Sequence, residues 1–324
     1  MSGLDLIQPW DDGPRFTRLG MGCWAIGGHG WGKVDDDASE RALRQARERG
    51  VTFFDTADCY GLGKSERMLR DTFGDGLRSL FVASKGGVRW NDAGRVRADC
   101  SPTYLRSAAE ASLRRLGLER LPLYYIHKPD GFTPIPEMVG ALVRLREEGK
   151  IGEIGVSNFS AGQLAEALCA APVRFVQNPF NLLQRESGLE LADLCRRSGI
   201  RLVAWGALAD GLLSGKFNRE TTFGDDDHRS RLAAFQGETF LRNLQAVDAL
   251  REFAHGRGVT LAQLALRWVL DAFPFTCALF GVKTAAQVDE NLGADGWRLA
   301  KADMARIDAC VGPLPRTRLP EGPR

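Results

Sequence analysis

Residues 51–61 have the sequence VTFFDTADCYG, in which a strand-like apolar run ends at an aspartate and is followed closely by a tyrosine. Two later runs have the same form: LFVASKGG (80–87) ends near a lysine, and LYYIHKPD (123–130) ends at a histidine. These runs lack polar/apolar alternation, as is typical of parallel strands that are covered on both faces. The pattern predicts a parallel sheet that carries one polar side chain near the end of each strand.

Eight such runs alternate with helical patterns along the chain. The expected strands are Arg18–Gly22, Thr52–Asp55, Leu80–Ser84, Leu123–His127, Glu153–Val156, Phe175–Asn178, Arg201–Trp205 and Cys277–Gly281. Eight parallel strands that alternate with helices predict a closed (β/α)8 barrel. We expect a single domain over residues 1–324, with an N-terminal segment and an additional helix near Glu238–His255, between the seventh and eighth strands.

Helix starts are marked by polar residues at capping positions. The expected capping boxes are Asp37 with Glu40, Ser160 with Gln163, and Thr260 with Gln263.

Four polar side chains follow these strands and combine the groups that a proton-transfer site requires. They are Asp55, Tyr60, Lys85 and His127. Strand ends form the active face of a (β/α)8 barrel, so we expect the four to meet there. A free tyrosine has a pKa of about 10. We expect Lys85 to lower the pKa of Tyr60 by favouring its phenolate, and Asp55 to keep Lys85 charged.

Composition excludes several classes of function. The 324-residue chain is 44% hydrophobic and 26% charged, with a formal net charge of +2, which gives no reason to expect nucleic acid or a charged membrane as partner. No apolar run approaches the roughly 18 residues of a membrane-spanning helix, and the N-terminus does not resemble a signal peptide. Seven scattered cysteines without a CxxC predict reduced thiols in a cytoplasmic protein, and four histidines without paired spacing predict no metal site.

A short glycine motif matches the dinucleotide-binding fingerprint only superficially. Gly20, Gly22 and Ala25 have the required spacing, but the glycine-rich residues 26–32 that follow are not expected to open a helix. We therefore expect a first strand and a mobile loop at the barrel mouth, rather than a Rossmann fold.

An ordered set of motifs from about Leu19 to Asn291 resembles the aldo-keto reductase family. The motifs are Phe54–Gly61 with Ser65 and Glu66, Ser84-Lys85, Ile126-His127, Gly149–Phe159, Gln177–Asn181, and Phe280–Lys283 with Gln287 and Asn291. The sequence is most similar to the bacterial and potassium-channel-β-subunit-like branches, because Gly281-Val282-Lys283 replaces a proline-lysine-serine form.

The resemblance implies a role for each of the four polar residues. Tyr60 is the general acid that protonates a carbonyl oxygen as hydride arrives, and Lys85 and Asp55 tune its pKa. His127 orients the carbonyl group. The implied activity is NADPH-dependent reduction of an aldehyde, a ketone or a sugar-like carbonyl.

The resemblance also implies an NADPH site along the strand ends. Ser157, Asn158 and Gln177 match positions that hold the carboxamide, although such residues also occur in strand-end turns. Trp205 stands where the family has an aromatic ring against the nicotinamide, and Lys283 adds a charge for a 2′-phosphate at a helix N-terminus. The remaining implied contacts are Gly206, Leu208, Gly211, Leu213, Ser214, Lys216, Gly281, Gln287 and Asn291.

The substrate side is less determined by the sequence. Trp24, Trp31 and Trp90 fall in or near loops at the expected active face and are candidates for pocket walls. Three arginines of the third loop are either contacts for a polar or anionic substrate or solvated surface charges; they are Arg89, Arg95 and Arg97.

Two other functions stay open at the level of sequence. The same fold serves as a non-enzymatic, NADP-binding regulatory subunit, and a complete set of four polar residues does not exclude that role. A barrel lyase or hydrolase that uses Lys85 as a Schiff-base amine is the second alternative.

Overall fold

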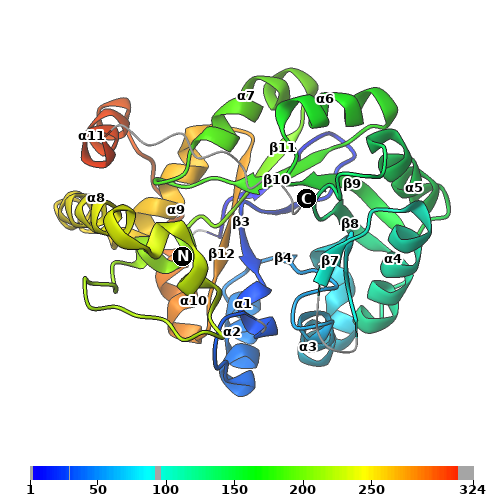
Figure 1. The fold of residues 1–324 in the computed structure, drawn as a ribbon, viewed down its shortest axis with the longest axis horizontal. Helices are drawn as coiled ribbons and strands as arrows, with labels where there is room; N and C mark the ends of the chain where they lie inside the picture. Colours follow the sequence, from blue (N-terminus) through cyan, green and yellow to red (C-terminus); the bar gives the residue numbers. More distant parts are fainter. Residues whose placement is uncertain (1–2, 29, 92–95, 313–324) are drawn as a thin grey trace.

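A computed structural model of the chain describes residues 3–28, 30–91 and 96–312. Eight parallel strands close into a barrel in the order β3, β4, β5, β8, β9, β10, β11 and β12 (Figure 1). Their bounds are Leu19–Gly22, Phe53–Asp55, Phe81–Gly86, Leu121–Ile126, Ile151–Ser157, Phe175–Pro179, Arg201–Trp205 and Thr276–Gly281. The predicted (β/α)8 barrel is confirmed.

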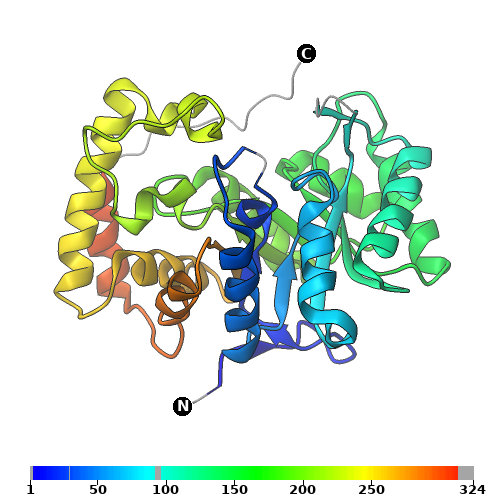
Figure 2. The same ribbon diagram turned by 90° about the horizontal axis from the view of Figure 1, so that it is seen from below.

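Helices surround the barrel and cover its outer face (Figure 1). The barrel helices are α2 (Asp36–Glu48), α3 (Lys64–Phe73), α4 (Pro102–Leu116), α5 (Ile135–Glu147), α6 (Ala161–Ala170), α7 (Glu186–Ser198), α9 (Leu261–Ala272) and α10 (Ala285–Leu292). The predicted additional helix is present as α8 (Gly237–His255), and it packs beside α11 (Lys301–Val311) at one edge of the molecule. Both views show these two helices together (Figures 1 and 2).

Two short hairpins lie outside the barrel sheet. One joins β1 (Leu6–Ile7) to β2 (Phe16–Thr17), and the other joins β6 (Val88–Trp90) to β7 (Val96–Ala98). Figure 2 shows the N-terminal hairpin at one end of the barrel and the β6–β7 hairpin at the opposite end. The second end is where the parallel strands finish, and it is the end that carries the candidate site.

Side chains inside the barrel change from apolar to polar along two of its strands, β5 and β10. Phe81 and Ala83 of β5 belong to the apolar interior cluster, and Lys85 follows two residues later on the same face. In β10, Phe175 is followed by Gln177 in the same way. Because side chains of a strand alternate between faces, a spacing of two keeps each polar group inside the barrel. These two strands thus contribute to a packed lower layer and to a polar upper layer.

The predicted bounds of all eight strands agree with the structure to within two residues, and the end of β5 lies two residues later than expected. The sequence predicted that the strand would end at Ser84, with Lys85 at or beyond its end, whereas β5 continues to Gly86. Lys85 pairs in register with Tyr125 of β8. Its ammonium therefore projects from the regular wall of the barrel rather than from a loop, which restricts its position.

Two of the three predicted capping boxes are present. Ser160 with Gln163 caps α6, and Thr260 with Gln263 caps α9. The expected box of Asp37 with Glu40 is wrong, because α2 begins earlier and Asp35 is its N-cap. Three successive aspartates offer the same capping chemistry, so the sequence did not fix which of them starts the helix.

The glycine-rich segment after β3 also differs from the expectation. A single helical turn, α1 (Trp24–Gly27), forms where no helix was expected, and it ends at Gly28 with a φ of 84°. One turn is far shorter than the helix that a dinucleotide fingerprint opens. The segment lies at the end of the barrel that carries the strand ends (Figure 2).

Candidate active site

Lys85 joins the polar side chains of the upper layer into one network. Its Nζ donates to Oδ1 of Asp55 at 2.5 Å and to the backbone oxygen of Thr56 at 2.8 Å. The same Nζ lies 3.2 Å from the hydroxyl of Tyr60. Lys85 and Asp55 are both almost fully buried. The structure therefore brings together three of the four predicted polar residues through a single ammonium group.

The turn that carries Tyr60 depends on a close approach of two glycines. A Cβ at Gly61 would lie only 2.1 Å from the backbone oxygen of Gly27, and a Cβ at Gly27 would lie 2.9 Å from the backbone of Gly61. Gly61 also has a φ of 58°, which favours glycine. The short helix α1 thus packs directly on the turn after β4 and holds Tyr60 over the barrel.

The pKa of Tyr60 differs from the sequence-based prediction. Burial raises the pKa of the phenol well above its usual value of about 10, and the carboxylate of Asp55 raises it further. The expected net lowering does not occur, because the loss of solvating water on burial and the charge of Asp55 together exceed any stabilisation of the phenolate by the Lys85 ammonium. Tyr60 is therefore fully protonated at neutral pH, which is the form that a general acid requires.

His127 completes the group at the end of β8. Its ring lies 5.7 Å from the Tyr60 ring, measured between centroids, at an angle of 80°. Burial lowers the pKa of His127 well below its usual value, and the charge of Lys85 lowers it further. The imidazole is therefore neutral near pH 7. Its Nδ1 lies 3.6 Å from Sγ of Cys59, so Nε2 is the nitrogen available to a ligand in the barrel mouth.

Three residues that the family resemblance assigned to the cofactor are bonded to this network. Gln177 donates from Nε2 to Oδ2 of Asp55 at 2.7 Å. Asn158 donates from Nδ2 to the backbone oxygen of His127 at 2.9 Å, and its Oδ1 accepts from Nε1 of Trp205 at 3.2 Å. Ser157 is buried beside Asn158 and accepts from its Nδ2 at 3.1 Å. These residues therefore connect the acid–base group to strands β9, β10 and β11.

A cluster of aromatic rings forms one wall of the site. Trp24 stacks with Tyr60 at a centroid distance of 6.1 Å and contacts Trp31 edge-on at 5.2 Å. His228 lies 4.7 Å from Trp24 and 4.5 Å from Trp31, also between centroids. Two of the three tryptophans predicted for the pocket are thus adjacent, and a histidine that the sequence did not suggest lies between them.

His228 belongs to the long segment between β11 and α8, which reaches across to the glycine-rich segment. Its backbone nitrogen donates to the oxygen of Gly30 at 2.9 Å, and Trp31 forms an isolated antiparallel bridge with Asp227. The His228 ring bonds to Gly30 through Nδ1 and to Asp210 through Nε2. We call residues 224–231 the strap, because they connect the two sides of the barrel mouth.

Lys283 lies beside two further cations under the strap. Its Nζ donates to the backbone oxygen of Trp31 at 2.8 Å. Burial lowers the pKa of Lys283, and the neighbouring charges of Arg229 and Lys216 lower it further. Partial desolvation and the charge of Arg229 likewise lower the pKa of Lys216. Asp227, which forms an ion pair with Arg229, is the carboxylate of this group. Three cations around one carboxylate fit an anionic, phosphate-bearing cofactor.

Arg229 was missed by the sequence-based reasoning, which found only one cation for the phosphate. The signal was an arginine two residues after Asp227 in the acidic stretch GDDDHRSR, which has the composition of a solvated loop. The fold buries Arg229 against aromatic rings instead, with Phe223 at 4.6 Å and Trp31 at 5.3 Å from its guanidinium carbon. Aromatic contacts of this kind depend on tertiary structure.

The other residues that the resemblance assigned to the cofactor differ in burial and in hydrogen bonding. Leu213 is fully buried in the hydrophobic core. Ser214 donates to the oxygen of Gly211, and Gln287 accepts from the backbone nitrogen of Lys283. The others lie as follows: Gly206, Leu208 and Gly211 are partly exposed after β11, Lys216 and Gly281 are exposed, and Asn291 is buried in α10.

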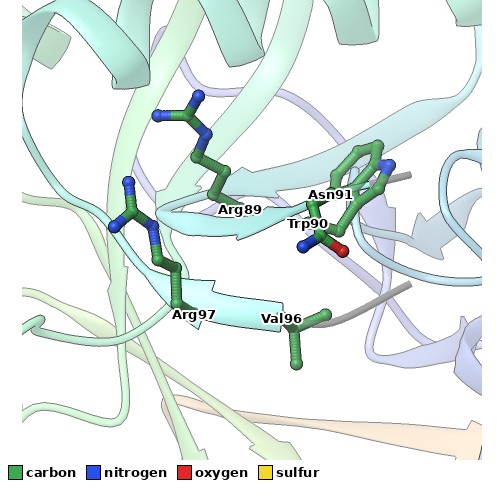
Figure 3. Close-up of a pocket in the computed structure, with 5 residues that line it drawn as sticks. All are labelled: Arg89, Trp90, Asn91, Val96 and Arg97. Atoms are coloured by element: carbon green, nitrogen blue, oxygen red, sulfur yellow. The ribbon is translucent and has the colours of Figure 1, made fainter. Parts of the chain in front are cut away.

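The β6–β7 hairpin carries the other residues proposed for the substrate side (Figure 3). Arg89 and Arg97 are directly opposite each other on the two strands, and both approach Asp99, at 3.5 and 4.0 Å. A pocket of about 380 Å³ lies against Arg89, Trp90, Asn91, Val96 and Arg97. Trp90 lies 5.9 Å from the guanidinium of Arg115 on α4, whereas Trp24 and Trp31 contact each other at the strap. Arg95 is outside the described residues.

No helix in the described part of the chain is long and apolar enough to cross a membrane.

Comparison with known proteins gives a consistent set of matches. Residues 18–312 match the family model described as "Aldo/keto reductase family". The chain is 35% identical over 304 residues to aldo-keto reductase YhdN of Bacillus subtilis, covering 93% of this chain and 92% of that protein. It is 32% identical over 299 residues to aldo-keto reductase yakc [NADP(+)] of Schizosaccharomyces pombe, covering 90% and 88%.

A solved structure extends the similarity to three dimensions. The glycerol dehydrogenase AKR11B4 from Gluconobacter oxydans superimposes with a TM-score of 0.87 at 35% identity, covering 98% of this chain and 99% of that one. The similarity therefore includes the whole barrel and the loops at its mouth.

Proposed function

The chain belongs to the aldo/keto reductase family, and from this premise we propose that it is an NADPH-dependent reductase of small carbonyl compounds with Tyr60 as its general acid. The family catalyses the interconversion of carbonyl and alcohol groups with nicotinamide cofactors. The main support for Tyr60 as the general acid is the position of Lys85. Its Nζ bonds to Asp55 and lies 3.2 Å from the Tyr60 hydroxyl.

Tyr60 donates its phenolic proton to the carbonyl oxygen as the carbonyl carbon is reduced. The raised pKa of the phenol keeps this proton in place until the oxygen begins to carry negative charge. As the proton leaves, the ammonium of Lys85 faces the developing phenolate and stabilises it. Solvent returns a proton to Tyr60 after the alcohol has left.

His127 holds the carbonyl oxygen within reach of Tyr60. The imidazole is neutral, so it carries one N–H, and Nε2 is the nitrogen that does not face Cys59. A donor at Nε2 orients the oxygen without competing with Tyr60 as the acid. Asn158 supports this geometry because it bonds to the backbone oxygen of His127.

The cofactor is proposed to lie along the strand ends from β9 to β12. Bound NADPH supplies the hydride for reduction of the carbonyl carbon. Ser157, Asn158 and Gln177 offer amide and hydroxyl groups for its carboxamide, and Trp205 offers a ring face. The cations around Lys283 favour a 2′-phosphate, which supports NADPH rather than NADH. The yeast relative named with NADP(+) agrees with this choice.

The substrate class is proposed to be small and partly polar. The aromatic wall of Trp24 and Trp31 supports binding of an apolar face, while Tyr60 and His127 bind the oxygen. The relative titled glycerol dehydrogenase favours a second candidate, oxidation of a small polyol at the same site in the reverse direction.

The proposal is tested by turnover with a panel of aldehydes, ketones and polyols and both nicotinamide cofactors. The expected result is loss of NADPH absorbance with a small aldehyde or ketone. Tyr60→Phe is the matched control, because it keeps the ring and removes only the acidic proton. General acid catalysis is worth about 10²–10⁴-fold, so kcat should fall by this factor while cofactor affinity is retained.

Two results would contradict the proposal. Near-wild-type turnover in Tyr60→Phe would exclude Tyr60 as the acid. Tight cofactor binding without turnover of any substrate would favour the non-enzymatic regulatory alternative, and trapping of a substrate on Lys85 by borohydride would favour the Schiff-base alternative.

A further inference from the structure

Three side chains next to the proposed acid offer metal-binding atoms at one point. Sγ of Cys59 lies 3.6 Å from Nδ1 of His127, and a carboxylate oxygen of Asp58 lies within 4.8 Å of a possible ligand atom on each of these two residues. Asp58 and Cys59 belong to the turn after β4, whereas His127 follows β8, 68 residues after Cys59. The spacing of the histidines predicted no metal site, because this grouping arises only when the barrel closes.

The buried carboxyl group of Asp58 is incompletely hydrogen-bonded. Its side chain is 1% exposed, and within the described residues its Oδ1 has no hydrogen-bond partner. Its Oδ2 accepts a long bond of 3.5 Å from the hydroxyl of Tyr104, and the backbone N–H of Cys59 also donates to the carboxyl group. Buried polar atoms are almost always satisfied, and an exception points to a missing ion or ligand. Asp58 therefore has the bonding capacity that a cation would use.

The distance between Cys59 and His127 agrees with ligation of one metal ion. Zinc bonds of about 2.3 Å to sulfur and about 2.0 Å to nitrogen place these atoms roughly 3.5 Å apart in a tetrahedral site. A thiol–imidazole hydrogen bond has a similar length, so Asp58 is the group that distinguishes the two interpretations. Its oxygen needs to approach by roughly 1 Å to complete a third ligand.

We propose that Asp58, Cys59 and His127 form a Zn²⁺ site whose fourth position faces the barrel mouth. A thiolate and an imidazole select zinc over magnesium or calcium, which prefer oxygen ligands. Binding displaces the proton of the Cys59 thiol, so that one thiolate and one carboxylate balance the two charges of the ion. Cys59 and His127 are partly exposed, which gives the ion a path from solvent.

Occupancy of this site should inhibit reduction. A metal bond at Nδ1 fixes the ring of His127, and ligation of Asp58 and Cys59 displaces the turn that carries Tyr60. This consequence depends on the function proposed above, but binding of the ion does not.

The binding experiment uses Co²⁺ as a spectroscopic probe of the full-length protein without cofactor. One equivalent should give a cobalt–thiolate charge-transfer band that Zn²⁺ abolishes in competition. Cys59→Ala should lose the band and bind at least about tenfold more weakly, since even outer partners of a metal ligand are worth 10–100-fold. Asp58→Asn, which keeps the shape of the side chain, should weaken binding while retaining the band.

Cys169→Ala is the matched control, because Cys169 is an exposed thiol on α6, away from the strand ends. It should leave the band and the affinity unchanged. Absence of bound cobalt, a spectrum without the thiolate band, or equal affinity in Cys59→Ala and wild type would overturn the site.

An inhibition experiment separates the site from the proposed function. Zn²⁺ should inhibit wild-type turnover but have little effect on Cys59→Ala, with each rate measured against the same protein without metal. Equal inhibition of both proteins would overturn the inhibitory role. A protein that binds cobalt through Cys59 but turns over no carbonyl would retain the metal site and contradict the reductase proposal.

Discussion

The two ends of the barrel interior share the same barrel strands but contain different kinds of side chain. At the lower end, Phe16 of the N-terminal hairpin stacks on Phe81 of β5 at 4.2 Å, and both lie against Phe175 within about 6 Å. At the upper end, four residues further along β5, Lys85 is buried with a carboxylate and a phenol. Aromatic packing fills the lower layer, whereas the upper layer holds groups that are costly to bury.

This difference shows that one layer of the barrel interior mainly stabilises the fold, whereas the other holds the reactive groups. The lower layer loses water-exposed apolar area and gains contacts, which stabilises the fold. The upper layer stabilises the fold only if every charge keeps its partner, since a buried charge without one is strongly unfavourable. Substitutions in the two layers should therefore affect stability and turnover in different proportions.

The largest effect is expected from Lys85→Met. Removal of the ammonium leaves Asp55 buried without its ion-pair partner, which should cost about 3–5 kcal/mol of unfolding free energy. Turnover should also fall at least about a hundredfold, because Tyr60 loses the charge that stabilises its phenolate. Urea denaturation and steady-state kinetics measure the two losses separately.

A double variant provides the control for Lys85→Met. Asp55→Asn combined with Lys85→Met removes both charges, so it should recover part of the stability but none of the activity. A stable and active Lys85→Met protein would contradict the coupling between Lys85 and Tyr60.

Phe81→Ala should affect stability alone. Loss of a buried phenylalanine typically costs about 3–5 kcal/mol, and Phe81 contacts three other rings of the lower layer. The variant should keep the wild-type kcat at temperatures where it remains folded. Phe81→Leu should lose less stability, because it leaves a smaller cavity. A fall in kcat of the folded Phe81→Ala protein would show that the two layers are coupled.

Lys283→Ala tests whether a charged residue at the rim of the upper layer contributes to cofactor binding. A charge-assisted contact to a 2′-phosphate is worth about 1.5–3 kcal/mol, so NADPH affinity should fall about ten- to a hundredfold. NADH affinity should barely change, because NADH has a hydroxyl at that position. Arg231→Ala removes an exposed cation from the strap as a control. Equal losses for both cofactors would mean that Lys283 does not bind the phosphate.

The smallest effect is expected for the pH dependence of stability that His228 of the strap contributes. Burial opposes protonation of His228, but bonds to Asp210 and Gly30 outweigh it and raise the pKa of the imidazole. Its contribution to stability is therefore complete below the unfolded pKa of about 6.5 and is lost as pH rises through the folded value. The stability difference between wild type and His228→Gln should stay under about 1 kcal/mol and shrink from pH 6 to pH 8. A difference that grows over this range would contradict the protonated contact.

Much of the upper layer could be predicted from strand patterns. Asp55, Lys85 and His127 each end an apolar run, and parallel strands bring such ends to one face. Capping boxes at Ser160 and Thr260 were also predictable, because the interaction is local. The sequence did not predict that Asp35 is the N-cap of α2, because the neighbouring aspartates offer the same capping group.

Residues from long loops could not be predicted in the same way. Arg229 and His228 belong to a polar stretch whose local pattern indicates a solvated loop, yet the strap packs them against Trp31. The grouping of Cys59 with His127 likewise has no local signal. The family branch suggested by Gly281-Val282-Lys283 stays a prediction.

The sequence by itself determined the (β/α)8 barrel, the family and the polar residues of its active face, because strand periodicity and ordered motifs are encoded locally. Only the tertiary structure decided the electrostatic state of those residues. Tyr60 keeps its proton because burial and the neighbouring carboxylate of Asp55 raise its pKa. A pKa depends on every charge and on all the solvent around a group, and those surroundings exist only after distant strands and loops have packed.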